Sequence, residues 1–497
     1  MLWLLTLPAL YFVGTFVFDR WLFGGRRLNH APVRDAGGRW TFRNWGGNVE
    51  FHPAVVEAPQ TLDELLALVN AHGKAGRRIK PVGGVHSWSA CAATDEVCVQ
   101  MGRLDRVLGH DQARRTITAE AGIQLKDLYL AMDERDLAIA SIPNVDTIQL
   151  GGAVSNATHG TNFSRGTMSS YVTELQIVLF REGRAQLVTL KRGEPWFEAA
   201  VASFGSLGIL YSLTLQCEEP YACFVVEHSF PFSHVEGRIE EMARKHYSAL
   251  FSVATSTGVV RSKIQVPIPR DLVQADSVCL LTQNDLRALK ILLWSASPTA
   301  KTWLRTRKFL GKLFYNASLG RLGSADMQRK RRREGLMSWR DAELLSRIFA
   351  VTATSPWINL EYAIPANRAD EACRKLLDLH QKYPVLTSFI MRPVGPDAHG
   401  YLSPTRDRPT VYFDIGYHQE LLGTGLYDEA EKVLLACEGR CSWSRLFKAP
   451  AEVVTRQFPL YPEFIKAKRE MDPQNVFSNK FSDDILAPAR EALPTAA

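Results

Sequence analysis

Two glycine-rich segments hold the residues best suited to chemistry, 81–89 (PVGGVHSWS) and 150–162 (LGGAVSNATHGTN). Glycine lets a ligand approach the backbone closely, so both segments can present N–H groups to a pyrophosphate. Neither matches the GxGxxG dinucleotide pattern or the GxxxxGKS/T phosphate loop, so a nicotinamide cofactor is not indicated. His86 lies in the first segment, and its residue type allows either a satisfied loop histidine or the attachment point of a larger group.

Short β-rich runs alternate with helical runs over about residues 51–217 and must position these two segments. A strand, a helix and a strand are predicted over 54–84, where Thr61 and Glu64 have the spacing of a capping box at the helix start. Residues 116–139 repeat the theme with a turn at Gly122, which is typical of an α+β unit. Further expected elements are strands over 173–180 and 208–217 and a helix around 195–204.

Length and composition indicate a large globular protein. A chain of 497 residues has room for two domains, and 46% hydrophobic with 22% charged residues is an ordinary globular composition. The net charge of +7 is small for this length, so nucleic acid is not indicated as a partner. The eight cysteines form no CxxC pair and no zinc spacing, which indicates reduced thiols and no metal site.

The N-terminal segment is expected to be a membrane anchor, over residues 1–27. Residues 1–18 carry no charged side chain, and Arg20 and further arginines follow. No basic residue precedes the run and no A-x-A-like site follows it, which favours an uncleaved anchor over a signal peptide. The arginines lie on its C-terminal side and predict a cytoplasmic catalytic domain. Pro8 and Gly14 leave a shallow hairpin as the alternative.

A second membrane-proximal segment is predicted over 285–340, where aromatic residues such as Trp294 and Trp303 alternate with Lys and Arg. This composition suits a helix in the headgroup region of an anionic leaflet. The alternative is a solvated basic loop, which is the better interpretation for 329–333 taken alone. With an anchor at the N-terminus, membrane contact explains both segments together.

The two glycine-rich segments are part of an ordered set of motifs that resembles the sugar-lactone and alditol oxidases, which are vanillyl-alcohol-oxidase-type flavoproteins. The resemblance runs from about residue 44 to 486 and is most specific over its first 170 residues. Each motif is weak alone, and their order carries the resemblance. The other motifs are NWGGNVEFHPAVVEAPQTLDELLALV, VQMGRLDRVL, ITAEAGIQLKDL, ASFGSLGILYSLTLQC, NLEYAIP, YLSP and REMDPQNVFSNKF.

The resemblance implies a two-domain α+β flavoprotein with FAD between the domains. A PCMH-type FAD-binding domain (44–218) would be completed by a C-terminal strip (451–497), and an α/β substrate cap would span 219–450. His86 matches the histidine that carries an 8α-histidyl bond to FAD, and such a bond makes a flavin a stronger oxidant. Asn156 and Ala157 depart from the usual Thr-Gly or Ser-Gly pair. The other matched cofactor residues are Gly83, Gly84, Val85, Ser87, Trp88, Gly151, Gly152, Ser155, Thr158, His159, Gly160, Gly205, Gly208 and Ile209.

The resemblance also implies catalytic positions in the cap, where this sequence departs from the family. The cap of alditol oxidases supplies a Glu-x-Arg pair and a Lys within His-Trp-Gly-Lys. Here the first is Ile390-Met391-Arg392, so the carboxylate is absent. The second is Ser442-Trp443-Ser444-Arg445, so Arg445 replaces the Lys with a planar fork rather than a point charge. Arg392 keeps its place and is expected to hold a substrate oxygen or to support negative charge on the flavin.

Two carboxylates are candidates for the missing group. Asp414 alternates with Phe413 and Ile415 on an expected strand and can supply the absent carboxylate, although a charge facing water on an edge strand is the alternative. Glu361, in NLEYAIP, matches a family position whose role is catalytic or structural. The absence of a glutamate at Ile390 makes this wall of the site more apolar.

The sequence therefore predicts an FAD-dependent oxidase that transfers a hydride from a hydroxyl-bearing carbon of a sugar lactone or polyol, in the manner of D-arabinono-1,4-lactone oxidase. Pro143 matches a position that controls oxygen access and favours O₂ as the electron acceptor. One alternative is a flavin enzyme with another acceptor, or with a larger apolar or lipid-linked substrate taken from the membrane. Another is a flavin-binding protein without catalysis, which the presence of His86 and Arg392 disfavours.

Overall fold

The computed structural model describes residues 32–35, 37–255, 257–268, 336–338, 357–383, 386, 388–418 and 422–491. The predicted anchor (1–27) lies outside these residues, as does all of the 285–340 segment except 336–338. No helix in the part of the chain that the structure describes is both long and apolar enough to cross a membrane. The predicted domain boundaries stay predictions.

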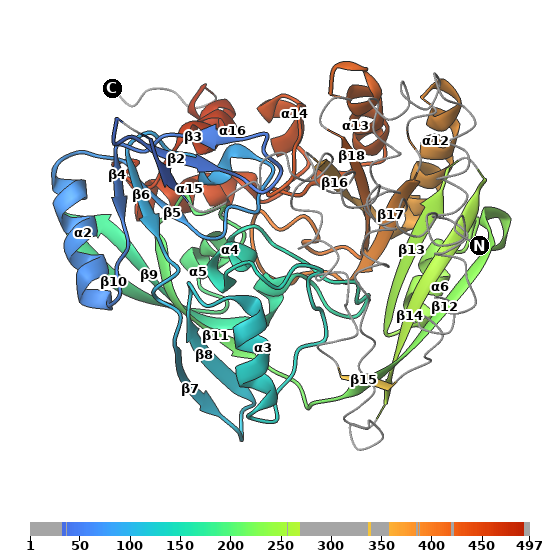
Figure 1. The fold of residues 1–497 in the computed structure, drawn as a ribbon, viewed down its shortest axis with the longest axis horizontal. Helices are drawn as coiled ribbons and strands as arrows, with labels where there is room; N and C mark the ends of the chain where they lie inside the picture. Colours follow the sequence, from blue (N-terminus) through green and yellow to red (C-terminus); the bar gives the residue numbers. More distant parts are fainter. Residues whose placement is uncertain are drawn as a thin grey trace, which may run out of the picture.

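Two bodies of secondary structure lie side by side (Figure 1). The first body, formed by residues 32–217, contains a parallel sheet in the order β4-β6-β5 and an antiparallel sheet in the order β10-β9-β11-β8-β7. Its strands are β4 (Val55–Glu57), β5 (Ile79–Val82), β6 (Val97–Gln100), β7 (Val107–Asp111), β8 (Thr116–Glu120), β9 (Val172–Arg181), β10 (Arg184–Lys191) and β11 (Ile209–Gln216). Its helices are α2 (Leu62–Lys74), α3 (Leu125–Asp133), α4 (Leu150–Ser155) and α5 (Pro195–Ala200), and the short strands β1 (Val33–Arg34), β2 (Trp40–Arg43) and β3 (Glu50–Phe51) pair with one another.

The second body is built on an antiparallel sheet with the order β15-β12-β14-β13-β17-β18-β16-β19. Strand β18 therefore lies between β17 and β16 rather than at an edge. Its strands are β12 (Ala222–Pro231), β13 (Ser248–Ala254), β14 (Val259–Ile268), β15 (Leu336–Ser338), β16 (Trp357–Pro365), β17 (Ser388–Val394), β18 (Thr410–His418) and β19 (Arg440–Cys441). Helices α6 (Ile239–Lys245), α12 (Ala369–Lys382) and α13 (Leu426–Ala436) accompany this sheet (Figure 1).

Local sequence explains where several of these elements begin. Helix α2 starts after Thr61, whose Oγ1 accepts a hydrogen bond from the Glu64 backbone N–H at 3.2 Å, as predicted. The Glu64 carboxylate in turn accepts a hydrogen bond from the backbone N–H of Gln60. In a standard capping box the donor would be the N–H of the N-cap residue itself, Thr61. The strands expected over 173–180 and 208–217 are confirmed as β9 and β11.

The second glycine-rich segment, 150–162, begins with a helix. Residues 150–155 form helix α4, which places Leu150, Ala153 and Val154 in the core. Burial of these side chains outweighs the low helix propensity of the paired glycines. The helix predicted around 195–204 ends earlier, at Ala200.

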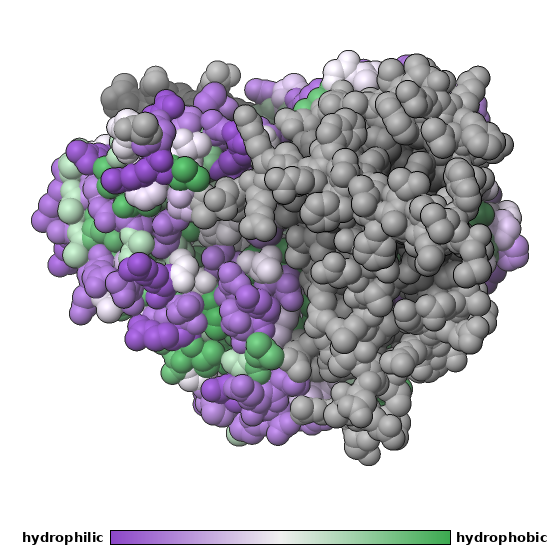
Figure 2. Space-filling view, viewed as in Figure 1, coloured by the Kyte–Doolittle hydropathy of each residue, from purple (hydrophilic) through white to green (hydrophobic). Residues whose placement is uncertain are grey.

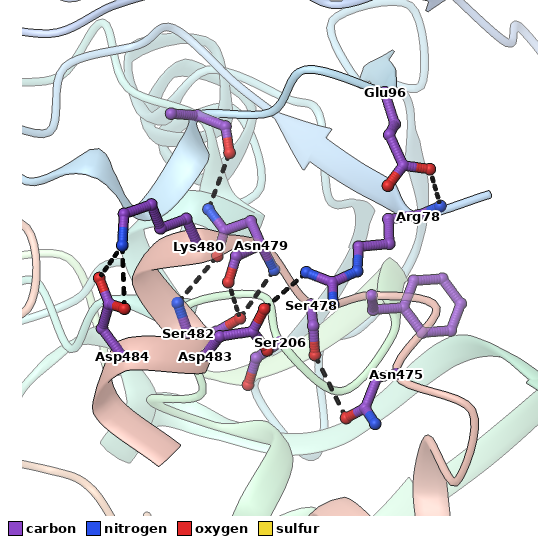
Figure 3. A network of polar contacts seen from close by, with 12 residues as sticks. Arg78, Glu96, Ser206, Asn475, Ser478, Asn479, Lys480, Ser482, Asp483 and Asp484 are labelled. Carbon is purple, nitrogen blue, oxygen red and sulfur yellow. Dashed lines mark hydrogen bonds and ion pairs between the residues drawn. The ribbon is translucent and has the colours of Figure 1, made fainter. Parts of the chain in front are cut away.

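The C-terminal helices α14 (Ala451–Thr455), α15 (Tyr461–Met471) and α16 (Lys480–Glu491) return to the first body. Figure 3 shows the contact, in which Arg78 pairs with Asp483 of α16 at 2.5 Å. The Asn479 side-chain amide donates to the backbone carbonyls of Ala90, Cys91 and Ala93, at 3.2, 3.1 and 2.8 Å. Asn479 thus binds the backbone that directly follows the His86 segment.

A large apolar core continues through both bodies and includes Leu213 of β11, Phe251 of β13 and Leu360 of β16. A shared core of this kind holds the bodies in a fixed relation. On the face drawn in Figure 2, the described residues around α2 are mostly hydrophilic, and smaller hydrophobic areas lie near α3. The described cysteines are buried free thiols.

Candidate active site

A cavity of about 370 Å³ lies between the two bodies and has the size of a small-molecule or cofactor site. All four predicted catalytic residues line it, namely Glu361, Arg392, Asp414 and Arg445. The predicted cofactor residues that line it are Gly83, Gly84, Val85, His86, Ser87, Trp88, Pro143, Gly151, Gly152, Ser155, Thr158, His159, Gly205 and Gly208.

Two predicted cofactor residues are absent from the cavity lining, which corrects that part of the expectation. Ile209 begins β11 and is fully buried in an apolar cluster with Val178 and Phe180. Gly160 packs its backbone against Ile142, so closely that a Cβ would lie 2.7 Å from the Ile142 nitrogen. The close backbone approach therefore explains the glycine at this position without any ligand contact.

The His86 segment leaves the end of β5 in an unusual conformation. Val85 has φ of +53°, which is costly for a β-branched residue, and its carbonyl accepts a hydrogen bond from the Trp45 N–H at 2.9 Å. The His86 ring stacks on Trp45 with centroids 6.2 Å apart, and its Nε2 lies 3.3 Å from the Thr147 hydroxyl. A half-buried imidazole is thus presented to the cavity by a constrained backbone.

Residues 443–445 of the second body hold the same segment from the other side. The Trp88 N–H donates to the Ser444 carbonyl at 2.7 Å, and the Ser89 hydroxyl donates to the Trp443 carbonyl at 2.6 Å. The Arg445 guanidinium lies over the Trp88 ring, 4.7 Å from its centroid. The two bodies are therefore joined beside His86 by polar contacts and by one cation–π contact.

The second glycine-rich segment also contributes to the cavity lining. The Gly151 N–H donates to the Ala121 carbonyl at 2.8 Å, and a Cβ at Gly151 would lie 3.0 Å from the Ala121 methyl group. Gly152 has open space where a Cβ would be, and it lines the cavity. Ala157 follows α4 with φ of +50°, a conformation that favours glycine.

A buried charged cluster closes the cavity on the side of the second body. Glu361 of β16 and Asp414 of β18 are direct cross-strand partners, and they are 1% and 6% exposed. Arg392 of β17 lies 3.1 Å from the Asp414 carboxylate and 3.7 Å from that of Glu361. Arg445 lies 3.0 Å from the other Glu361 oxygen, and His159 Nε2 lies 3.4 Å from Glu361 Oε1. Two carboxylates, two guanidiniums and one imidazole therefore share one desolvated volume.

The two carboxylates differ in acid strength because different cations reach them. Burial raises the pKa of Glu361, but the charges of Arg445 and His159 outweigh burial and hold that pKa well below its ordinary value. Burial, together with the negative charge of Glu361, raises the pKa of Asp414 despite the nearby Arg392. Glu361 is thus the stronger acid of the pair, and Asp414 is the carboxylate with the higher proton affinity.

The alternative for Asp414, a charge facing water on an edge strand, is wrong. Strand β18 is internal, and Phe413 and Ile415 on the opposite face of the strand belong to the core. Asp414 is also the direct cross-strand partner of Ile390. The carboxylate lacking at Ile390 is therefore matched by one on the adjacent strand at the same level of the sheet.

Two family models match the chain, the FAD binding domain over residues 53–189 and D-arabinono-1,4-lactone oxidase over residues 341–485. L-gulono-1,4-lactone dehydrogenase of Mycobacterium tuberculosis is 24% identical over 457 residues, covering 90% of this chain and 99% of that protein. L-gulonolactone oxidase of Mus musculus is 24% identical over 460 residues, with coverage of 90% and 98%. The structure of a solvent-stable cholesterol oxidase superposes with a TM-score of 0.72 at 18% identity, covering 90% of this chain and 97% of that chain.

The chain is similar to L-gulonolactone oxidases and dehydrogenases over about 90% of its length. Its fold is the mixed helix-and-sheet FAD-binding fold of the vanillyl-alcohol-oxidase type, as predicted. The cavity fits FAD, because Gly83 and Gly152 leave backbone accessible in its lining. A Cβ at Gly83 would lie 2.6 Å from Gln149 Oε1, a buried oxygen without a hydrogen-bond partner that lines the cavity. Such an oxygen is expected to accept a hydrogen bond from a ligand.

Several residues that line the cavity were not predicted from the sequence, including Lys80, Gln149 and Asn359. Gln149 directly precedes the segment 150–162, and Asn359 is the first residue of the motif NLEYAIP, which was singled out only for Glu361. Lys80 gave a usable signal, since a lysine inside the β-rich run IKPV is unusual for a buried strand.

Proposed function

We propose that this protein is an FAD-dependent oxidase that oxidises a hydroxyl-bearing carbon of a sugar lactone or polyol and passes the electrons to O₂. The observation that carries the proposal is the buried cluster of Arg392, Asp414, Glu361 and Arg445 in the same cavity as the His86 segment. The family model for D-arabinono-1,4-lactone oxidase covers the strand and loop that carry Asp414 and Arg445.

The residues of the cluster divide the work of alcohol oxidation. When bound, FAD supplies the acceptor for the hydride that leaves the carbinol carbon, and O₂ takes up the two electrons to give H₂O₂. Asp414 accepts the proton of the substrate hydroxyl as the carbon–oxygen double bond forms. Arg392 donates to the substrate oxygen and stabilises the negative charge that develops there.

Glu361 keeps the two arginines in place rather than exchanging a proton. Its oxygens lie 3.0 Å from Arg445 and 3.7 Å from Arg392, and its lowered pKa favours the charged form. Within this cluster, the two carboxylates balance the two guanidiniums, so neither arginine offers an uncompensated charge to an anionic substrate. The cluster therefore favours a neutral hydroxyl compound over a hydroxy acid.

Covalent attachment of FAD through His86 is part of the proposal. The constrained Val85 backbone and the Trp45 ring hold the imidazole at the cavity, which supports a reaction at one fixed position. Pro143 lines the cavity and supports access of O₂. An attached flavin is a stronger oxidant, and this property suits an oxidase.

Oxygen consumption tests the proposal. The purified protein is assayed with lactones, alditols, long-chain alcohols and sterols, and we expect H₂O₂ in step with oxidation of a lactone or alditol. Arg392→Ala should lose turnover and keep its flavin absorbance. Arg374→Ala is the matched control, because Arg374 is exposed and pairs only with Glu236 among the described residues. Absence of turnover with every substrate, or full activity of Arg392→Ala, would contradict the proposal.

A further inference from the structure

Lys80 is a buried lysine in the wall of the FAD cavity. It lies on β5, three residues before Gly83, and its side chain is 1% exposed. Its ammonium donates to the carbonyl of Phe204 at 3.1 Å and to that of Gly205 at 3.0 Å. Gly205 lines the same cavity and has φ of +66°, so the lysine lies beneath a second glycine turn.

Among the described residues, the Lys80 ammonium meets carbonyl oxygens rather than a carboxylate. The nearby carboxylate of Asp472 is already bound by Lys468 at 2.5 Å and by the N–H of Phe477 at 3.0 Å. Burial of a cation without a counter-ion is unfavourable, so an anionic ligand is the expected partner.

The burial of Lys80 is reflected in its pKa. Burial lowers the pKa of Lys80 to about 8, although the negative charges nearby raise it. The titratable groups that act on it are Cys91 and Asp472, which raise the pKa, Lys468, which lowers it, and the more distant Asp483, which raises it. A bound anion would favour the charged form and remove much of this perturbation.

We propose that Lys80 is a cofactor-binding residue whose ammonium neutralises the diphosphate of FAD. The inference rests on FAD binding and is independent of which substrate is oxidised. This role accounts for a lysine at a buried position where an apolar side chain would cost less free energy to bury. The competing explanation is a structural role, in which Lys80 only caps the carbonyls of Phe204 and Gly205.

Ligand affinity separates the two explanations. Lys80→Met is combined with His86→Ala, so that FAD binds reversibly, and FAD, ADP and riboflavin are titrated into apoprotein. Loss of a charged hydrogen-bond partner should weaken FAD and ADP about tenfold to a hundredfold. Riboflavin lacks the diphosphate and should bind unchanged. Equal weakening of FAD and riboflavin, or no weakening of FAD, would overturn the proposal.

Proton uptake gives a second readout without turnover. Calorimetry of FAD binding in buffers of different ionisation enthalpy should show almost no uptake at pH 6.5 and up to about one proton at pH 9, because apo Lys80 is mostly neutral there. Lys80→Met should abolish the uptake at pH 9, and its persistence would refute the proposal. Lys468→Met is the matched control, since Lys468 is equally buried and donates to the neighbouring Ser206 carbonyl, but pairs with Asp472.

Discussion

Replacement of Asp414 by asparagine is the sharpest test of the proposed chemistry. The amide has nearly the same shape and keeps an oxygen for Arg392, which lies 3.1 Å from the carboxylate. It cannot accept the proton of the substrate hydroxyl. Removal of a positioned base costs roughly a hundredfold to ten-thousandfold in rate, so flavin reduction should slow by about this factor.

The pH profile carries the more specific signature. Only the ionised form of Asp414 accepts a proton, so the rate of flavin reduction should fall as the pH drops through the pKa of Asp414. Burial and Glu361 raise that pKa above the ordinary value for aspartate, so this loss begins at a higher pH than for an exposed aspartate. The assay is anaerobic stopped-flow, with flavin absorbance followed from pH 5 to 9.

Glu361→Gln provides the contrast, because the pKa of Glu361 lies well below its ordinary value. Glu361→Gln should weaken the contacts with Arg445 and Arg392 and lower the rate of flavin reduction at every pH. The fall of that rate at low pH, the acidic limb of the profile, should remain. Asp414→Asn should flatten that limb. If Asp414→Asn reduces its flavin within a factor of ten of wild type, or retains the limb, Asp414 is not the base.

Three further predictions follow from the geometry beside the cofactor. Acid-precipitated protein should keep its flavin, and His86→Ala should release it into the supernatant; release from the wild type would contradict covalent attachment. Ala157→Gly should stabilise the fold by roughly 1 kcal/mol in urea unfolding, because φ is +50° at this position, whereas Ala153→Gly inside α4 should destabilise it. Trp88→Leu should lower kcat more than Trp88→Phe, since only an aromatic ring keeps the cation–π contact with Arg445; equal rates would exclude a positioning role for the ring.

Much of the local structure could be predicted because it depends on near neighbours in the sequence. Thr61 begins α2 since its hydroxyl reaches a backbone N–H three residues ahead, and no distant contact is needed. The place of the two glycine-rich segments in the cavity lining could be predicted for a similar reason, since exposure of their backbone depends on the glycines of the segment itself. Ile209 was predicted to contact the cofactor but does not line the cavity, because it lies on a strand whose side chains alternate between faces and its own side chain faces the core.

The charged cluster could be predicted only in part, because it depends on strand order. Alternation placed Asp414 opposite Phe413 on its strand, but the sequence does not say whether that strand is internal or at an edge. The order β17-β18-β16 settles this point and brings three strands, each from a different part of the chain, into one face. Lys80 was missed for a comparable reason, since its partners Phe204 and Gly205 lie more than 120 residues away.

The same strand order explains why the absence of a carboxylate at Ile390 need not abolish the chemistry. In a sheet, the functional unit is the cross-strand pair rather than the position along one strand, and Asp414 faces Ile390 directly. Asp414 is flanked by Glu361 on the other side, so the replacement also places two carboxylates next to each other. Burial and the negative charge of Glu361 raise the pKa of Asp414, whereas Arg445, His159 and Arg392 hold the pKa of Glu361 well below its ordinary value. In the proposed reaction, Asp414 on β18 therefore takes the place of a carboxylate at Ile390 as the partner of a substrate hydroxyl. The raised pKa of Asp414 also increases its proton affinity, as the role of a base requires.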